Sequence, residues 1–281
     1  MEIGISLPVR ELQDDLSAIK DFAQVAEELG FTHLRVPDLL IRSDGGPLHE
    51  PLTLLSWLAG ATERIGLVPS VIILPARPTV LVAKQAATVD ILSAGRLRLG
   101  VGVGGSREEY DALGQDFTSR GRRCDEQIDL LRRLWTEETV DFQGGTETLA
   151  RVGIAPRPVQ QPIPIWIGPG SGGDGGIAPS VLRRVGERAD GWFAILPREQ
   201  LASTQARIAE YAIAAGRDPV RIGVEGAVPV AGRDAEDWLA DVDGWQDAGA
   251  THLCLRTLGA GLDAAGHVSA MREAAALLTD R

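Results

Sequence analysis

The chain has 281 residues, of which 44% are hydrophobic and 24% are charged. This composition indicates a folded protein with a sizeable core and excludes a globally disordered chain. The 39 acidic and 28 basic residues give a net charge of −11 at pH 7, which argues against a general binder of nucleic acids or anionic membranes. The two cysteines and four histidines show no CxxC, HExxH or HxH spacing, so no metal site is predicted.

The sequence shows no targeting or membrane segment. Residues 1–5 lack the basic and apolar regions of a secretory signal, and the longest apolar stretch, 65–75, is interrupted by Pro69 and Ser70. We therefore expect a cytoplasmic protein with no membrane partner.

Predicted strands alternate with predicted helices along the chain. Short apolar runs bounded by Pro, Gly or polar residues indicate buried strands, and apolar residues spaced by three and four indicate helices. The expected strands cover residues 3–7, 32–36, 65–73, 97–103, 163–167, 191–196, 221–230 and 251–256. The expected helices cover residues 12–29, 52–62, 78–93, 125–135, 179–185, 201–215, 235–248 and 268–278.

Eight strand–helix units in a chain of this length predict an α/β fold of the (β/α)8 TIM-barrel type, as a single domain over residues 1–281. The lack of hairpin signals between the units favours a parallel sheet. An open, doubly wound sheet is the alternative. Residues 139–149, which contain a Gly144-Gly145 turn, are expected to form a small excursion after the fourth unit.

A glycine run at the end of the fourth predicted strand is a candidate binding segment, because the active sites of such barrels lie in the loops that follow the strands. Residues 100–105 match the dinucleotide fingerprint G-x-G-x-x-G. A long polar segment follows them, however, rather than an immediate apolar helix. We therefore expect Gly102 and Gly104 to leave room for a flat ligand. An NAD-dependent dehydrogenase that uses this run is an alternative hypothesis.

A second glycine-rich loop, residues 168–173, follows the fifth predicted strand and precedes a helix that carries Arg183 and Arg184. Backbone N–H groups in such a loop can hold a phosphate, although a plain surface turn is as good an explanation. Asp38 follows the second predicted strand and would point towards the barrel mouth, although a helix cap or a solvated loop residue is the commoner role.

These features occur in the same order in a known family. The strongest match is residues 83–97 (AKQAATVDILSAGRL), followed by the glycine run and Glu109-Tyr110. The chain resembles the luciferase-like monooxygenase superfamily, in particular its deazaflavin (coenzyme F420)-dependent oxidoreductases. Further matching segments are residues 120–121, 130–135, 156–160, 164–168, 189–192, 216–219, 249–253 and 258–262.

The resemblance implies a (β/α)8 barrel with a flavin or deazaflavin ring in its mouth. It implies a non-proline cis peptide bond at Ser70-Val71, behind the ring, and an Asp38 that forms a hydrogen bond near the ring. It also implies a loop that holds the cofactor phosphate. The cofactor-binding residues expected in total are Asp38, Ser70, Val71, Gly102, Gly104, Gly168, Pro169, Gly170 and Ser171. No catalytic acid or base is identified.

The chain departs from the family pattern at several positions. Leu39 stands where relatives often have His, and Gly105 stands where the sugar-phosphate dehydrogenases of the family carry a catalytic Glu. Relatives have Arg-His-Pro after the third strand, where this chain has Arg77-Pro78-Thr79. The flavin-using luciferases place an Arg for the flavin phosphate where this chain has Val103. This last difference favours coenzyme F420 over FMN.

The sequence therefore predicts an oxidoreductase that transfers a hydride between coenzyme F420 in the barrel mouth and an unidentified small organic substrate. The alternatives are an FMN-dependent monooxygenase of the same superfamily and a non-catalytic barrel that binds a flavin or deazaflavin. Residues 52–58 form an apolar helix of the kind that makes the dimer contact in relatives, although burial against the barrel's own strands would explain it too. We expect a homodimer.

Overall fold

The structure, a computed structural model, describes residues 1–41, 48–170 and 176–279. Within these residues nine strands form one sheet in the order β3-β2-β1-β11-β10-β9-β8-β5-β4, with parallel neighbours. β3 and β4 are two pieces of one barrel strand, so the nine pieces fill eight positions. The strands are β1 Glu2–Ser6, β2 His33–Val36, β3 Gly66–Pro69, β4 Ile72–Ile73, β5 Leu99–Gly102, β8 Ile165–Ile167, β9 Gly191–Phe193, β10 Gly223–Pro229 and β11 His252–Arg256.

The sheet closes into a barrel through the interrupted strand. On one side of it, Leu67 of β3 lies opposite Leu34 of β2. On the other side, the backbone N–H of Leu67 donates to the carbonyl of Arg96 at 2.9 Å, its carbonyl accepts from the N–H of Arg98 at 3.0 Å, and β4 pairs with β5. The predicted TIM barrel is confirmed. The open, doubly wound alternative is wrong, because such a sheet would keep two unpaired edges.

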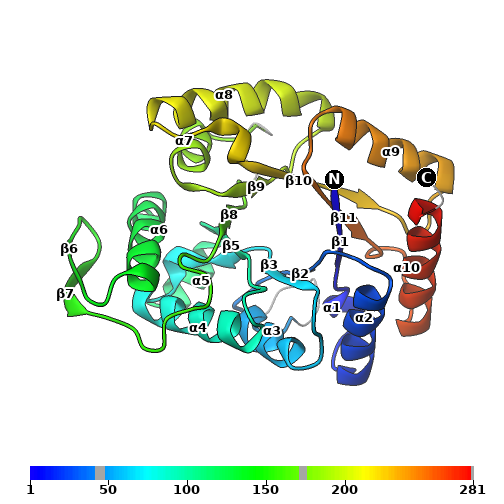
Figure 1. Cartoon of the computed structure of the whole chain (residues 1–281), viewed down its shortest axis with the longest axis horizontal. Helices are drawn as coiled ribbons and strands as arrows, with labels where there is room; N and C mark the ends of the chain where they lie inside the picture. The colour runs from blue at the N-terminus through cyan, green and yellow to red at the C-terminus, as the bar shows by residue number, and fades with distance from the viewer. Residues whose placement is uncertain (42–47, 171–175, 280–281) are drawn as a thin grey trace.

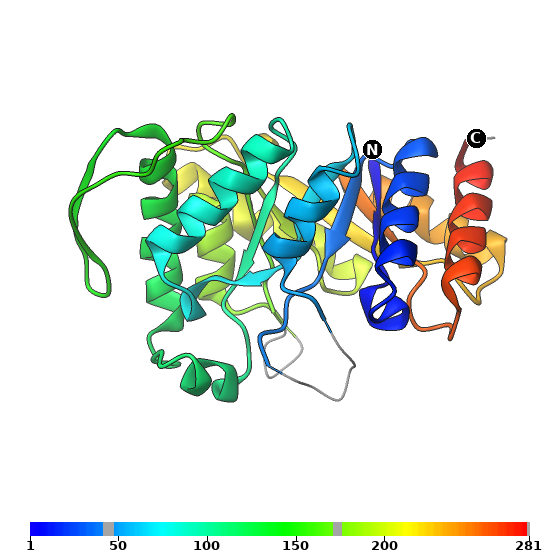
Figure 2. The same ribbon diagram turned by 90° about the horizontal axis from the view of Figure 1, so that it is seen from below.

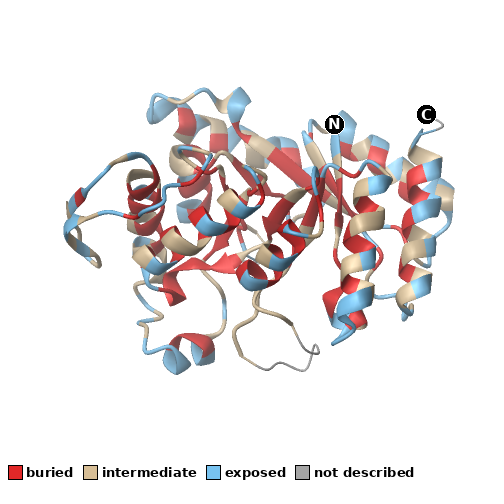
Figure 3. Cartoon of the chain, turned by 60° about the horizontal axis from the view of Figure 1, so that its bottom comes forward, coloured by how far each residue is buried: buried red, intermediate tan, exposed pale blue. Residues whose placement is uncertain are grey.

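Helices cover the outside of the barrel. Figure 1 shows them as a ring around the strands, and Figure 3 shows that the strands and the inward faces of the helices are buried. In α2, for example, Ile19, Phe22 and Ala26 are buried, and this spacing places them on one face. The helices are α1 Val9–Leu12, α2 Leu16–Glu28, α3 Pro51–Ala59, α4 Thr79–Leu92, α5 Arg107–Ala112, α6 Arg120–Thr136, α7 Pro179–Arg188, α8 Leu201–Ala214, α9 Ala235–Asp247 and α10 Ala264–Thr279. Among the described residues, none of them has the length and apolar character that crossing a membrane requires.

Two predicted helices differ from the structure. The helix expected over residues 12–29 is interrupted, because Gln13 adopts a left-handed backbone conformation (φ 48°) and the side chain of Asp15 caps α2 as a new start. α6 begins at Arg120 instead of near residue 125, and the short α5 lies within the segment that was expected to be an irregular polar loop.

The excursion expected after the fourth unit is an antiparallel hairpin of β6 Val140–Gln143 and β7 Thr148–Val152. Figure 2 shows it extending away from the barrel beside α6. The carboxylate of Glu126 on α6 holds the turn, because it accepts hydrogen bonds from the backbone N–H groups of Gly145 and Thr146 at 3.0 and 2.9 Å.

The interior of the barrel is filled by Trp166 at the amino-terminal ends of the strands. Its side chain packs on Gly191 and Gly223, where a Cβ atom would lie only 2.3 and 2.6 Å from the indole ring. The indole also contacts the ring of His252, with 4.7 Å between centroids, and the guanidinium of Arg98, at 4.3 Å. The two glycines therefore provide the space that the indole occupies.

We predict that Gly191→Ala destabilises the protein, because the new methyl group overlaps the indole of Trp166. Overpacking of this kind costs roughly 1–3 kcal/mol in the free energy of unfolding, measured by urea denaturation. Gly60→Ala is the control, because the nearest atom to its Cβ is 3.6 Å away; its effect should stay within about 0.5 kcal/mol. A Gly191→Ala protein as stable as the control would contradict the packing described.

Candidate functional site

Two cavities open at the carboxyl-terminal ends of the strands. The first, here called the glycine-loop cavity, has a volume of about 810 Å³ and lies among the loops that follow β5 and β8. The second, here called the arginine cavity, has a volume of about 780 Å³ and is lined by residues of β1, β2, β10 and β11 and the loops after them. Ser70, Phe193 and Ile195 line both cavities. Each volume is in the range of small-molecule sites.

The strand interruption between β3 and β4 forms part of the shared wall. Its Ser70-Val71 peptide bond is cis, which confirms the expectation from the resemblance. The Val71 side chain occupies the space beside two glycines: a Cβ on Gly102 would lie 2.6 Å from one of its methyl groups, and one on Gly168 would lie 2.8 Å from the other. The explanation that Gly102 and Gly104 leave room for a flat ligand is therefore corrected: Val71 takes the space beside Gly102, and a Cβ on Gly104 would lie 2.8 Å from a methyl group of Ile73.

Asp38 supports the interrupted strand from behind. Its buried carboxylate accepts hydrogen bonds from the guanidinium of Arg77 at 2.7 and 3.1 Å and from the backbone N–H of Ile73 at 3.0 Å. Asp38 lines neither cavity. Its expected hydrogen bond near a cofactor ring therefore stays a prediction, and the structure places it as an anchor for β4.

The glycine-loop cavity presents backbone donors. Within the part of the chain that the structure describes, the N–H groups of Gly104, Gly105 and Gly170 donate to no other atom of the protein. The first turn of α7 borders the same cavity through Ser180. Free N–H groups in loops and at the start of a helix attract anions.

Most of the predicted cofactor contacts come together here. Asp38 lies outside the cavity wall, and Ser171 lies outside the described residues. The predicted residues that line the glycine-loop cavity are Ser70, Val71, Gly102, Gly104, Gly168, Pro169 and Gly170. That they contact a cofactor stays a prediction.

Arg120 adds a positive charge to this wall. One of its terminal nitrogens donates to the carbonyl of Phe117 at 2.8 Å, and its guanidinium lies 3.8 Å from the centre of the Phe117 ring. Its Nε atom is buried and has no hydrogen-bond partner among the described residues. Arg184 lines the cavity too but is paired with Asp125 at 2.5 Å, and Arg183 does not line it.

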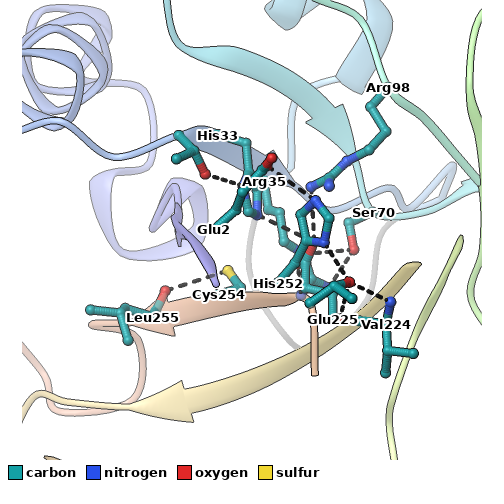
Figure 4. A network of polar contacts seen from close by, with 12 residues as sticks. Glu2, His33, Arg35, Ser70, Arg98, Val224, Glu225, His252, Cys254 and Leu255 are labelled. Carbon is teal, nitrogen blue, oxygen red and sulfur yellow. Dashed lines mark hydrogen bonds and ion pairs between the residues drawn. The ribbon is translucent and has the colours of Figure 1, made fainter. Parts of the chain in front are cut away.

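A buried carboxylate inside the barrel binds two arginines. Glu225 of β10 lies 2.9 Å from Nη1 of Arg35 on β2, 2.8 Å from Nη2 of Arg98 next to β5, and 3.2 Å from Nε2 of His33. Figure 4 shows these side chains converging on the carboxylate. Arg35 also donates from Nε to the hydroxyl of Ser70 at 2.9 Å. The cluster thus connects the barrel interior to the shared wall of the cavities.

Charge interactions set the ionisation of this cluster. Burial alone would raise the pKa of Glu225, but the charges of Arg35 and Arg98 and the contact with His33 outweigh it and bring the pKa far below its ordinary value. Burial lowers the pKa of His33, so its imidazole is neutral at pH 7. Burial also raises the pKa of the neighbouring Cys254 thiol to about 12. Two guanidinium groups share the buried carboxylate of Glu225, and the more exposed carboxylate of Glu2 also acts on Arg98.

This cluster was not predicted from the sequence. Arg35, Arg98 and Glu225 each lie within an otherwise apolar predicted strand, and a charged residue in a buried strand signals an internal ion pair or a ligand contact. That signal marks the residues individually. It does not indicate that they meet, because their strands are far apart in the sequence.

The fold and the cavities together define a (β/α)8 barrel with an anion-attracting cleft at its mouth. A family model described as luciferase-like monooxygenase matches residues 1–278. The chain therefore belongs to the luciferase-like monooxygenase family.

Curated relatives use either of two cofactors. The F420-dependent glucose-6-phosphate dehydrogenase of Amycolatopsis mediterranei is 35% identical over 182 residues, which cover 62% of this chain and 51% of that protein. The FMNH2-dependent dimethylsulfone monooxygenase of Pseudomonas putida is 30% identical over 154 residues, which cover 53% of this chain and 42% of that protein. The chain thus matches only about half of the length of these two relatives.

A solved structure described as an F420-dependent secondary alcohol dehydrogenase in complex with an F420-acetone adduct has the same fold. Its TM-score is 0.83 at 17% identity, and the match covers 99% of this chain and 98% of that chain.

We predict that Glu225→Gln destabilises the protein at pH 7 by roughly 3–5 kcal/mol, because two arginines lose their buried counter-charge. The pKa of Glu225 is lowered by folding, so its contribution is complete above the ordinary value of 4.5 and is lost as the pH falls. The difference in the free energy of unfolding between the wild type and Glu225→Gln should therefore decrease below about pH 4.5, by up to about 1.4 kcal/mol per pH unit.

Urea unfolding between pH 3 and pH 7 measures this difference. Glu137→Gln is the control: it removes a carboxylate from an exposed pair with Arg133 and should leave the free energy of unfolding nearly unchanged. Equal pH dependence in the wild type and Glu225→Gln would contradict the ionisation assigned to the cluster.

Proposed function

We propose that the chain is an oxidoreductase that binds the deazaflavin coenzyme F420 at the barrel mouth and transfers a hydride between it and a small organic substrate. The observation that carries the proposal is the donor set of the glycine-loop cavity. Three glycine N–H groups have no hydrogen-bond partner among the described residues, and these glycines share one wall with the charged side chain of Arg120. This set suits the phosphate group of a cofactor.

The residues of the chain fit such a cofactor. The free N–H groups and Arg120 would hold the phosphate, and the Ser70-Val71 segment would form the wall beside the ring, with Asp38 as its anchor. Phe193 and Ile195 are apolar and would limit the access of water where the cavities meet. A bound deazaflavin would supply two-electron hydride chemistry. The arginine cavity would hold the substrate, because it adjoins the same wall.

FMN is the second candidate cofactor. It carries a phosphate that the same donors would hold, and the relative from Pseudomonas putida is named as FMNH2-dependent. The chain would then be a monooxygenase. We favour F420, because Val103 stands where the flavin-using relatives place an Arg and because the relative from Amycolatopsis mediterranei is named as F420-dependent.

We predict that calorimetric titration of the purified protein shows tighter binding of coenzyme F420 than of FMN. Calorimetry is preferred to tryptophan fluorescence, because Trp166 and Trp192 line neither cavity and Trp245 lines the arginine cavity proposed for the substrate. A preference for FMN would replace the F420 proposal with the monooxygenase. Tight binding of NAD alone would contradict both. Binding without oxidation of the reduced cofactor by any of a broad substrate panel would favour a non-catalytic barrel.

We predict that Arg120→Leu weakens binding of the phosphorylated cofactor by about tenfold or more, the loss expected for a charge-assisted hydrogen bond. It should leave the affinity for the phosphate-free chromophore (riboflavin for FMN, the unphosphorylated deazaflavin for F420) unchanged. Arg107→Leu is the matched control, because Arg107 also lies over the Phe117 ring, at 4.8 Å, but does not line the cavity. Two outcomes would count against a phosphate role for Arg120. In one, Arg120→Leu weakens binding of the phosphorylated cofactor and of the phosphate-free chromophore equally. In the other, Arg107→Leu weakens cofactor binding as much as Arg120→Leu does.

A further inference from the structure

The hydroxyl of Ser70 accepts hydrogen bonds from two nitrogen atoms of one guanidinium. Nε of Arg35 lies 2.9 Å from its Oγ atom, and Nη2 donates to the same oxygen. A guanidinium only donates, and a hydroxyl oxygen has two lone pairs, so both lone pairs are engaged by Arg35. The hydroxyl proton must therefore point away from Arg35. Among the described residues no acceptor for that proton is found.

Arg35 is held in this orientation by the rest of the cluster. Its third nitrogen, Nη1, donates to Glu225 at 2.9 Å, and its guanidinium lies 4.6 Å from the centre of the Phe193 ring. Figure 4 shows Arg35 between the Glu225 carboxylate and Ser70. Turning towards another partner would cost Arg35 its bond to a fully buried carboxylate. The direction of the Ser70 hydroxyl is thus set before any ligand arrives.

Ser70 lies at the place where the two cavities meet. Ser70 lines both of them and is only half-buried, and Phe193 beside it also lines both. Behind the hydroxyl lies the positively charged guanidinium of Arg35, which shares the Glu225 carboxylate with Arg98. A donor backed by positive charge favours an acceptor that becomes more negative.

We propose that Arg35 is a positioning residue that makes Ser70 a fixed hydrogen-bond donor to an acceptor atom of the bound ring, and that this donor stabilises the reduced, electron-rich state of the ring. This inference rests on the proposed function. Flavin and deazaflavin rings both carry carbonyl oxygens and ring nitrogens that serve as acceptors.

A double-mutant cycle tests the dependence of Ser70 on Arg35. The dissociation constants of F420 and FMN are measured for the wild type, S70A, R35M and S70A/R35M. S70A should weaken binding about three- to tenfold in the wild-type background, as expected for one lost hydrogen bond. In the R35M background the same change should cost less than about twofold, because the hydroxyl is no longer oriented.

R98M is the matched control background. It removes an equal charge from the same carboxylate but does not touch Ser70, so S70A should cost the same in R98M as in the wild type. Glu225 keeps a guanidinium partner in R35M and in R98M, and thermal unfolding checks that every variant folds.

The midpoint potential of the bound ring is the readout that a merely structural role would not move. S70A should bind the reduced state less well relative to the oxidised state and thereby lower the potential; a tenfold change in that ratio is about 30 mV for a two-electron couple. Ser70→Thr keeps a hydroxyl and should restore both the affinity and the potential.

The possible failures are distinguishable. An S70A cost that is equal in the R35M and R98M backgrounds, or a potential that S70A leaves unchanged, overturns this inference and leaves the proposed function standing. A wild-type protein that binds neither F420 nor FMN overturns both.

Discussion

A single buried carboxylate organises the interior of this barrel. Glu225 lies where barrels usually contain branched apolar side chains, and it joins three strand positions, β2, β5 and β10, that are not neighbours in the sheet. A carboxylate without partners would be costly at this depth, so the two arginines and the glutamate depend on one another. The cluster fixes Arg35, and Arg35 in turn fixes Ser70 at the cavity wall.

The wall beyond Ser70 is held by contacts of a different kind. Val71 packs against Gly102 of β5 and Gly168 directly after β8, and Asp38 ties the following residues to Arg77. The segment between β3 and β4 is therefore held by a polar contact on one side, van der Waals packing on the other and an ion pair behind. Sites supported from several directions keep their geometry better than sites on isolated loops.

The fold could be predicted from the sequence because it depends on the spacing of apolar residues. Apolar runs and helical spacing indicate the elements whatever their partners are, and eight such units leave few architectures. The start of α2 was misplaced because the helix pattern continues through residues 12–15, while the capping side chain of Asp15 decides the boundary locally.

The candidate site could be predicted from the sequence only in part. The positions of the glycine loops follow from the strand ends, but the reason for Gly102 does not, because its neighbour Val71 belongs to another strand. The cis bond at Ser70-Val71 was expected only through the family resemblance. The cluster around Glu225 was missed altogether: its members come from residues 33, 35, 98 and 225, and contact between such distant positions depends on how the barrel closes.

The packing of Trp166 determines the route by which ligands enter and leave the site. The indole, seated on Gly191 and Gly223, fills the barrel at the end opposite the two cavities, and the ion pairs of Glu225 form a second layer above it. The barrel is therefore open at its mouth and closed at the opposite end. Anything that reaches Ser70 arrives through the mouth and must leave by it, so departure of one molecule and arrival of the next compete for the same opening.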